Sequence, residues 1–387
     1  MVTQKRLKIA FLTANDATNK NERSGTLYYM SKALQKHCGD VFYIGPLSTR
    51  MESFTRLLNN ISLKLFKKNY AYFNNILLSY SYSKIIKHKL SEEEYDLIFA
   101  PVASAELAFL DTDIPIIYTS DATFHLMSEY YPDQFSNLLS ISKKEGNFIE
   151  NTVIKKADLI LYPSEWAAKS AVKHYEGDES KIYKLPFGAN LDKIPSKEVV
   201  LEKEKPDKCR LLFLGMDWKR KGGDIAFATL LELEKLNIDT ELIICGCTPP
   251  EEFSHENMIV IPFLDKNDEN QSKELEKLFL SCDFLLLPTR NEAYGIVFCE
   301  ANAFGLPVIT TNTGGVSGVI DPGRNGFMLP EDAVGADYAK VIQEFYDDDE
   351  RYIELARSSR ETFDEKLNWD SWARNVCKLI NEMLDKR

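Results

Sequence analysis

Short apolar runs recur along the chain, each ending in small or polar residues and most followed by a segment of helical periodicity. In the first half such runs predict strands at 8–12, 41–44, 96–100, 114–118 and 158–162. The second half repeats the pattern at 210–214, 240–245, 258–261, 283–287 and 307–311. Strands that alternate with helices are typical of parallel sheets, so the pattern predicts an α/β fold with two doubly wound parallel sheets.

A charged segment separates the two halves. Residues 196–208 are dense in charge and contain a proline, which is typical of an interdomain linker. We therefore expect an N-terminal domain over 1–195, a linker over 196–208 and a C-terminal domain over 209–366.

The composition is that of a globular protein. Apolar residues make up 44% and charged residues 27% of the chain, which excludes disordered and collagen-like classes. No apolar run reaches the roughly 18 residues of a membrane-spanning helix, and the run 9–14 is too short for the core of a signal peptide. The seven cysteines lack the spacing of a zinc site. We therefore expect a cytoplasmic protein with reduced thiols.

The charge is unevenly distributed. The net charge of −12 argues against a nucleic-acid partner, yet residues 1–90 contain 15 Lys and Arg against 4 acidic residues. Residues 53–91 contain no acid; their cations are Arg56, Lys64, Lys67, Lys68, Lys84, Lys87 and Lys89. Apolar and aromatic residues lie between these charges, which fits peripheral contact with the anionic inner face of the membrane. The alternative is a helical hairpin whose apolar residues cover the domain.

The most informative chemistry lies between residues 288 and 315. Glu292 stands in the loop after strand 283–287, Gly295 opens a helix, and Glu300 lies on that helix. Ligands of open parallel sheets bind beyond the carboxyl ends of the strands, where both carboxylates and the helix amides can meet. Amides suit a diphosphate and carboxylates suit sugar hydroxyls. An isolated pair of acids would instead only solvate the start of a helix.

Two glutamates with seven residues between them, followed by Gly305-Leu-Pro-Val and Gly314-Gly315, resemble the signature of glycosyltransferase family 4, a family of retaining enzymes with the GT-B fold. Stretches 157–166, 181–192 and 321–327 resemble other parts of that family. The resemblance implies two Rossmann-like domains that face each other across a cleft. It also implies that a last helix, in 367–387, crosses back to the N-terminal domain.

The resemblance also implies roles for the residues of the donor site. Glu292 would lie against the transferred sugar and Glu300 would hold the ribose of the nucleotide. The phosphates would meet the backbone amides of Tyr294, Gly295, Ile296 and Val297.

A basic turn over 215–223 supplies cations. The family has a lysine before a glycine in this turn, and Lys221 before Gly222 matches it. The family also has an arginine directly after the first glycine of the turn, Gly215, where this chain has Met216. The resemblance implies phosphate contacts by Lys221 and the turn at Gly215, and we assign the role of the missing arginine to Arg220. A solvated cluster of charges is the alternative.

Two places in the N-terminal half complete the candidate site. Ser24, Gly25 and Thr26 resemble the family's loop over the donor phosphates and the acceptor. The family has a histidine directly after the strand at 114–118, where this chain has Asp121, with His125 four residues on. Both stay candidates for the polar group near the reacting centre, and a structural histidine is the alternative.

These features predict a retaining transferase that moves a sugar from a UDP- or GDP-sugar to a hydroxyl of a saccharide or lipid-linked saccharide, in cell-surface polysaccharide or glycoconjugate synthesis. No metal ion or other cofactor is expected, because no cluster of ligands has the spacing of a metal site. One alternative is a nucleotide-sugar-binding scaffold without turnover, which Met216 and the missing histidine favour. The other is a nucleotide-sugar epimerase of the GT-B fold.

Overall fold

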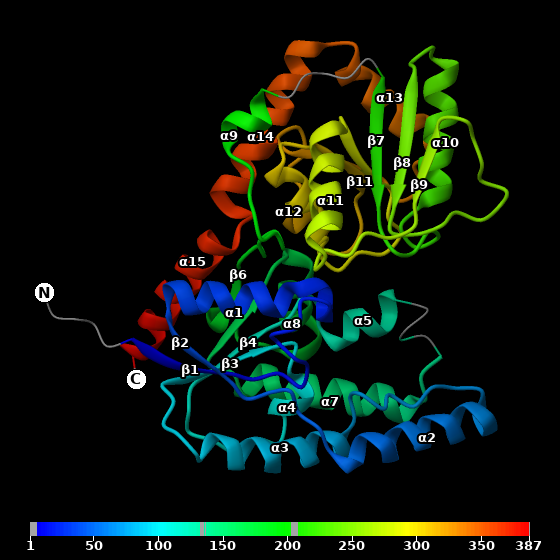
Figure 1. Ribbon diagram of the computed structural model, residues 1–387. Helices are drawn as coiled ribbons and strands as arrows, with labels where there is room; N and C mark the ends of the chain where they lie inside the picture. The colour runs from blue at the N-terminus through cyan, green and yellow to red at the C-terminus, as the bar shows by residue number, and fades with distance from the viewer. Residues whose placement is uncertain (1–5, 132–134, 136, 203–207, 387) are drawn as a thin grey trace, which may run out of the picture. The chain divides into compact units, whose positions relative to one another are not determined.

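The computed structural model describes residues 6–131, 135, 137–202 and 208–386 (Figure 1). The chain divides into two compact units, one of Met1–Pro186 with Trp372–Arg387 and one of Phe187–Ser371. Each unit contains a six-stranded parallel sheet. The fold class predicted from the apolar runs is therefore confirmed.

The sheet of the first unit has the strand order β2-β1-β3-β4-β5-β6. Its strands are β1 (Leu7–Phe11), β2 (Gly39–Tyr43), β3 (Leu97–Pro101), β4 (Ile116–Thr119), β5 (Leu159–Tyr162) and β6 (Ile182–Lys184). The helices are α1 (Thr26–His37), α2 (Arg50–Phe66), α3 (Ile76–Leu90), α4 (Ser104–Leu107), α5 (Phe124–Tyr130), α7 (Ser140–Lys156), α8 (Glu165–Tyr175) and the part of α15 (Trp369–Leu384) from Trp372 onward.

Alternate side chains of these strands enter two separate cores, because successive residues of a strand point to opposite faces. Ile98 and Tyr118 pack with Tyr82 of α3 and Ile149 of α7 on one face. On the other face, the ring of Phe99 meets the edge of Trp372, with 5.9 Å between the ring centroids. Residues from the start and the end of the sequence thus share one core.

The sheet of the second unit has the order β12-β11-β10-β7-β8-β9. Its strands are β7 (Cys209–Leu214), β8 (Thr240–Cys245), β9 (Met258–Ile261), β10 (Phe284–Leu287), β11 (Val308–Thr311) and β12 (Gly326–Leu329). Its helices are α9 (Lys197–Leu201), α10 (Gly223–Lys235), α11 (Glu269–Ser281), α12 (Ile296–Ala303), α13 (Gly335–Tyr346) and α14 (Asp349–Lys366).

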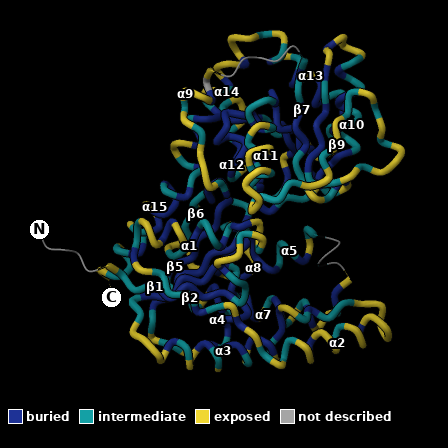
Figure 2. Tube along the Cα trace, in the orientation of Figure 1, coloured by how far each residue is buried: buried dark blue, intermediate teal, exposed yellow. Residues whose placement is uncertain are grey.

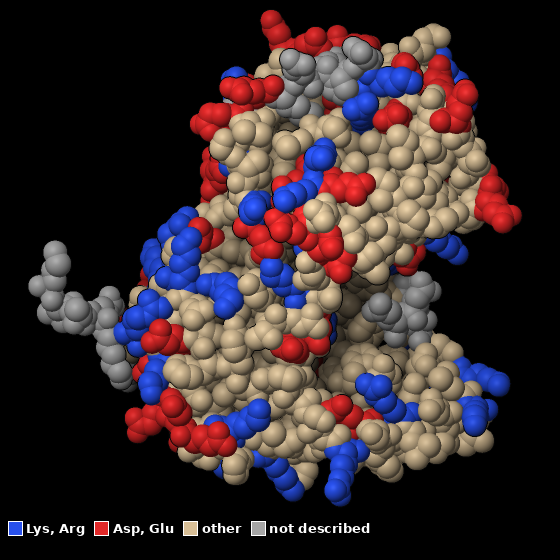
Figure 3. Space-filling view, in the orientation of Figure 1, with Lys and Arg blue, Asp and Glu red and all other residues tan. Residues whose placement is uncertain are grey.

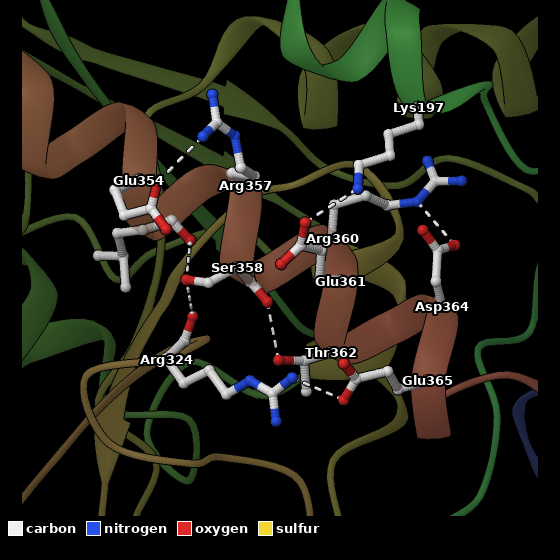
Figure 4. A network of polar contacts seen from close by, with 11 residues as sticks. Lys197, Arg324, Glu354, Arg357, Ser358, Arg360, Glu361, Thr362, Asp364 and Glu365 are labelled. Atoms are coloured by element: carbon white, nitrogen blue, oxygen red, sulfur yellow. Dashed lines mark hydrogen bonds and ion pairs between the residues drawn. The ribbon is translucent and has the colours of Figure 1, made fainter.

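The boundary between the units differs from the expected one. The chain enters the second unit at Phe187. The start of the expected linker 196–208 is helix α9 (Figure 2), in which Val200 is buried. Lys197 pairs with Glu361 of α14 at 2.9 Å, within a row of ion pairs along that helix (Figure 4). The charges suggested a solvated linker, but Lys197 binds a neighbouring helix. Residues 203–207 lie outside the described residues.

Within the described parts of the chain, none of the helices combines the length and apolar character needed to cross a bilayer. All seven cysteines are free thiols.

Candidate active site

The loops that follow β7 and β10 meet where the strand order of the second sheet reverses. β7 and β10 pair directly, although β8 and β9 come between them in the sequence. This switch point is where open α/β sheets bind ligands. The loop after β7 carries Lys221 and the loop after β10 carries Glu292, so two predicted site residues come to one place.

Backbone contacts fix these two loops against each other. The N–H of Arg290 donates to the carbonyl of Arg220 at 2.8 Å. Gly222 has a φ of +75°, and a Cβ added there would lie 1.9 Å from the carbonyl oxygen of Pro288. Only glycine fits this close approach, and it holds the neighbouring Lys221 beside the β10 loop.

Lys221 and Glu292 form an ion pair, in which Nζ of the lysine donates to Oε2 of the glutamate. Their side chains are only 10% and 12% exposed. The guanidinium of Arg220 donates to the carbonyl of Asn291 at 2.9 Å. Arg220 also pairs with Asp217 at 3.6 Å, so two cations and two carboxylates meet at the switch point. The two cations are side chains of the kind that bind phosphate groups.

The position at which the family has an arginine is different here. Gly215 directly follows β7 and donates its N–H to the carbonyl of Cys245 at 2.9 Å. The next side chain, Met216, is 77% exposed. Met216 provides no charge to this place, whereas Arg220 is on the loop that also carries Lys221.

Helix α12 begins with a geometry that leaves its first amides uncapped by any side chain. Gly295, the N-cap, has a φ of +97° and lies so close to the ring of Phe298 that a Cβ would come within 2.3 Å. The hydroxyl of Tyr294 donates to the carbonyl of Phe187 at 3.0 Å, and burial raises the pKa of this tyrosine well above its usual value. The side chain of Tyr294 thus anchors the helix, while the amides of Ile296 and Val297 begin it. Such a helix start can bind an anion.

Glu300, one turn further along α12, is a buried carboxylate with specific partners. Its side chain is 2% exposed, and its Oε1 accepts from Nζ of Lys266 at 2.5 Å. Burial raises the pKa of Glu300, while Lys266 and the backbone N–H of Asn190 oppose that rise. The side chain of Asn190 accepts from Nε1 of Trp369 at 2.9 Å, which holds Asn190 in place.

The loop predicted to contact phosphates and acceptor lies in the first unit, before α1. Arg23 and Ser24 have φ values of +52° and +55°, and Gly25 has +83°. A left-handed conformation costs about 1–2 kcal/mol for a residue with a side chain. Ser24 is exposed at this strained turn and Thr26 begins α1. Strain of this kind is often found in functional loops.

Asp121 and His125 follow β4 in the same unit, as expected, but their surroundings differ. Asp121 is half-buried in the turn after the strand, and His125 is in the first turn of α5. The ring of His125 lies against that of His174 of α8, with 3.8 Å between the centroids. Burial and the neighbouring His125 lower the pKa of His174. This pair was not predicted from the sequence, because the two histidines are 49 residues apart in it (174 against 125).

Comparison with known protein families matches both units. The family model described as Glycosyl transferases group 1 matches residues 197–362, and the model described as Glycosyltransferase Family 4 matches residues 25–193. The chain belongs to the family 4 glycosyltransferases. The predicted family is therefore confirmed.

Curated relatives of this family 4 glycosyltransferase include D-inositol 3-phosphate glycosyltransferases. The protein of Paenarthrobacter aurescens (strain TC1) is 28% identical over 242 residues, which are 60% of this chain and 58% of that protein. The protein of Corynebacterium efficiens is 24% identical over 312 residues, covering 75% of this chain and 72% of that protein. The alignments with the first two such relatives span 58% and 56% of their lengths, somewhat more than half.

Solved structures of the same fold cover nearly the whole family 4 chain. Sucrose-phosphate synthase of Thermosynechococcus elongatus aligns with a TM-score of 0.70 at 16% identity, over 99% of this chain and 100% of that one. WaaG, a glycosyltransferase involved in lipopolysaccharide biosynthesis, aligns with a TM-score of 0.62 at 17% identity, over 97% and 99%. At such identities the likeness concerns the fold, which is GT-B.

Two residues of this family 4 glycosyltransferase site were missed as functional candidates, Lys266 and Asn190. Lys266 lies in the coil that follows β9, and a lysine beyond the carboxyl end of a parallel strand is a signal that could have indicated it. In the described ranges, no three His, Cys, Asp or Glu side chains gather as they would around a metal ion. Metal-independent transfer stays a prediction.

Proposed function

We propose that this chain transfers a sugar from a nucleoside diphosphate to an acceptor hydroxyl and retains the configuration at the anomeric carbon. The observation that carries the proposal is the meeting of Lys221, Arg220 and Glu292 at the switch point of the second sheet. Glu300 and the start of α12 would hold the ribose and the phosphates beside it. The curated relatives named as glycosyltransferases support the same class of reaction.

The residues suggest how the step would be catalysed. As the bond from the anomeric carbon to the diphosphate breaks, negative charge grows on the leaving oxygen, and Lys221, Arg220 and the α12 amides would stabilise it. The acceptor hydroxyl would attack from the same face and give its proton to the departing diphosphate. The rate then depends on holding donor and acceptor together, without a dedicated protein base. No step in this scheme uses a metal ion, so activity is expected to survive treatment with EDTA.

Turnover by single variants tests this assignment. Glu292→Gln and Lys221→Ala should each lower kcat at saturating donor by about 100-fold or more, the scale of losing one electrostatic contact in a transition state. Lys340→Ala and Glu350→Gln, which change exposed residues of the same unit, are matched controls. Near-normal rates in both site variants would remove the proposed active site.

The donor is identified by a panel of nucleotides. Binding of UDP, GDP or ADP and of their sugars to the native protein raises its melting temperature by mass action, so a thermal-shift series ranks the bases. HepE of Anabaena has been crystallised with UDP-glucose, which makes UDP-sugars the first candidates. A scaffold would bind a nucleotide sugar without consuming it, whereas an epimerase would interconvert two such sugars without an acceptor.

We further propose that the acceptor is lipid-linked and that α2 touches an anionic membrane. The structure divides the basic segment 53–91 into two parts with opposite burial. In α3, Leu78, Tyr82 and Ile86 enter the core, as expected for a helix whose apolar residues cover the domain. In α2 most of the apolar side chains are exposed, Leu65 by 70%, and Met51 packs partly against the core.

Helix α2 is amphipathic, but its buried face is polar and its exposed face is apolar, the opposite of an ordinary surface helix. Its buried side chains are Thr55 and Ser62, whose hydroxyls donate to the carbonyls of Tyr72 at 2.9 Å and Lys68 at 2.6 Å. The α2 apolar face, defined as Phe54, Leu57, Ile61 and Leu65, recurs at spacings of three and four residues and is exposed. Lys and Arg side chains gather near the C-terminal end of α2 in a surface of mostly uncharged residues (Figure 3).

Vesicle binding tests the membrane proposal. At low salt the protein should sediment with phosphatidylglycerol vesicles and not with phosphatidylcholine vesicles, because each well-placed cation adds about 1 kcal/mol near an anionic surface. Changing Lys64, Lys67 and Lys68 together to Glu should abolish this binding, as should Leu57→Ser with Leu65→Ser. Lys235, Lys340 and Lys378 changed to Glu give the same change of net charge elsewhere and should leave binding intact. A lack of binding by the native chain at low salt would reject the proposal.

A further inference from the structure

The contact between Lys266 and Glu300 joins two segments that are 34 residues apart in the sequence. Lys266 belongs to the coil between β9 and α11, and this coil is tightly built. The N–H of Asp265 donates to the side chain of Gln271 at 2.9 Å, and the side chain of Asp265 accepts from the N–H of Asn267 at 2.9 Å. Lys266 is thus presented from a fixed turn and not from the tip of a free loop.

The carboxylate of Glu300 has room for more partners than it uses within the protein. An ionised carboxylate offers about four acceptor sites. Lys266 and the N–H of Asn190 use two of them. Two sites are left for donors, which matches the two neighbouring hydroxyls of a ribose.

This arrangement works only while Glu300 is ionised, because a protonated carboxyl must donate its own proton and accepts less well. The titratable groups around Glu300 come from three elements. They are Lys266 of the β9–α11 coil, Cys299 of α12 and, beside Cys299, Lys366 of α14, which pairs with Asp321 at 2.6 Å. Burial raises the pKa of Cys299 to about 12, so this thiol stays neutral over the working range.

We infer that Lys266 is a positioning residue for the nucleotide, which keeps Glu300 ionised in its buried place so that the carboxylate can accept from both ribose hydroxyls. The inference rests on the proposed function, in which Glu300 meets the ribose. It gives the β9–α11 coil a part in recognising ribonucleotides. The side chain of Lys266 is 38% exposed, so solvent reaches it although Glu300 is buried.

The test compares nucleotide affinities at two pH values by isothermal titration calorimetry. UDP, GDP and ADP are first compared to find the base that the native protein prefers. The probes are then the nucleoside diphosphate with that base and its 2′-deoxy counterpart. In the native protein, affinity should change less than about threefold between pH 8 and pH 6, with the ribonucleotide favoured by about tenfold or more. In Lys266→Met, affinity for the ribonucleotide should fall as the pH decreases, by up to about tenfold per pH unit, because Glu300 takes up a proton. The preference over the 2′-deoxy form should shrink with it.

Lys266→Arg keeps the positive charge and should retain the native dependence of affinity on pH. Lys273→Met removes an exposed lysine of α11 and is the matched control. Unchanged affinity and pH profile in Lys266→Met would overturn the inference while leaving the proposed function in place. An equal loss for ribo and deoxy forms at both pH values would also overturn it, since Lys266 would then bind the phosphates. If the native protein bound none of the nucleotides, the proposed function would fail, and this inference with it.

Discussion

Glu292 and Glu300 lie eight residues apart, in one loop and the helix that follows it, yet their surroundings prepare them for different tasks. Glu292 pairs with a lysine that is expected to meet the diphosphate, so its environment changes as the sugar leaves. Glu300 is deeply buried, and the part of the nucleotide that it is proposed to hold, the ribose, does not react. Contacts that are equal in the ground state and the transition state affect binding and not kcat. Glu300→Ala should therefore mainly raise the KM for the donor.

Another buried carboxylate, Glu150 of α7, makes the stability of the first unit depend on pH. Burial raises the pKa of Glu150 to about 7, and the hydroxyl of Tyr118 donates to its Oε1 at 3.1 Å. The folded pKa lies above the unfolded value of 4.5. The stabilising contribution of the neutral acid is therefore complete below pH 4.5 and is lost as the pH rises through 7.

Glu150→Gln is neutral at every pH and can still accept from Tyr118. The free energy of unfolding of Glu150→Gln should equal that of the native protein at pH 4.5. At pH 8 it should be larger by about 3 kcal/mol, the free energy that corresponds to the difference between a pKa of 4.5 and one of about 7. Urea unfolding at the two pH values measures the difference, with Glu344→Gln, an exposed acid, as the control. A pH-independent effect of Glu150→Gln would contradict the assignment.

The residues of the candidate site could be named from the sequence, but their contacts could not. Lys221, Glu292 and Glu300 lie in local patterns of glycine, charge and strand that are visible without a structure. The bond from Lys266 to Glu300 and the contact of His125 with His174 join helices or loops that only the fold brings together. No local spacing contains that information.

At the scale of elements, the strands with long apolar runs were predicted within about two residues of their observed ends. The two that were missed, β6 and β12, have three and four residues. β6 lies at an edge of its sheet and has no buried side chain, and β12 begins with a glycine. β6 and β12 are extended because they pair with the neighbouring strands β5 and β11. The local sequence pattern does not show this pairing.

The turn between β7 and α10 depends on one glycine. Gly222→Ala would force a Cβ against the carbonyl of Pro288, in a backbone conformation that side chains disfavour. We expect a loss of about 2–4 kcal/mol in unfolding free energy, together with weaker nucleotide binding. Gly323→Ala is a matched control, since Gly323 has nearly the same φ, +78°, but no atom within 4 Å of an added Cβ. It should cost only about 1–2 kcal/mol. Equal losses in the two variants would contradict a steric cause at Gly222.

At the scale of the whole molecule, the first unit is discontinuous in sequence and the second is not. Trp372 is 1% exposed and packs on Phe99, and Ala373, Val376 and Ile380 of the same helix are also buried, so α15 from Trp372 onward contributes to the core of the first unit. The second unit has its own sheet, its own helices and the proposed nucleotide site. The two units should therefore respond separately to substitutions in their cores.

Trp372→Ala tests this separation. Removal of a buried aromatic side chain typically costs about 3–5 kcal/mol, and here the loss should fall on the first unit. Hydrogen exchange should speed up in β1 and β3, while the nucleotide affinity of the second unit stays within about twofold of the native value. Trp372→Phe keeps a ring against Phe99 and should recover most of the protection. Loss of nucleotide binding with unchanged exchange in β1 and β3 would contradict the division.

The discontinuous first unit also sets an order of assembly during translation. A ribosome releases the strands β1 to β6 first, but Trp372 and the rest of that core leave it only after residues 187–371 have been made. The nascent first half therefore has an unfinished apolar face over Phe99 throughout the synthesis of the second half. The second unit, continuous in sequence, has all its core residues available before the first unit does. The unit whose strands are made earlier is thus the later of the two to be completed.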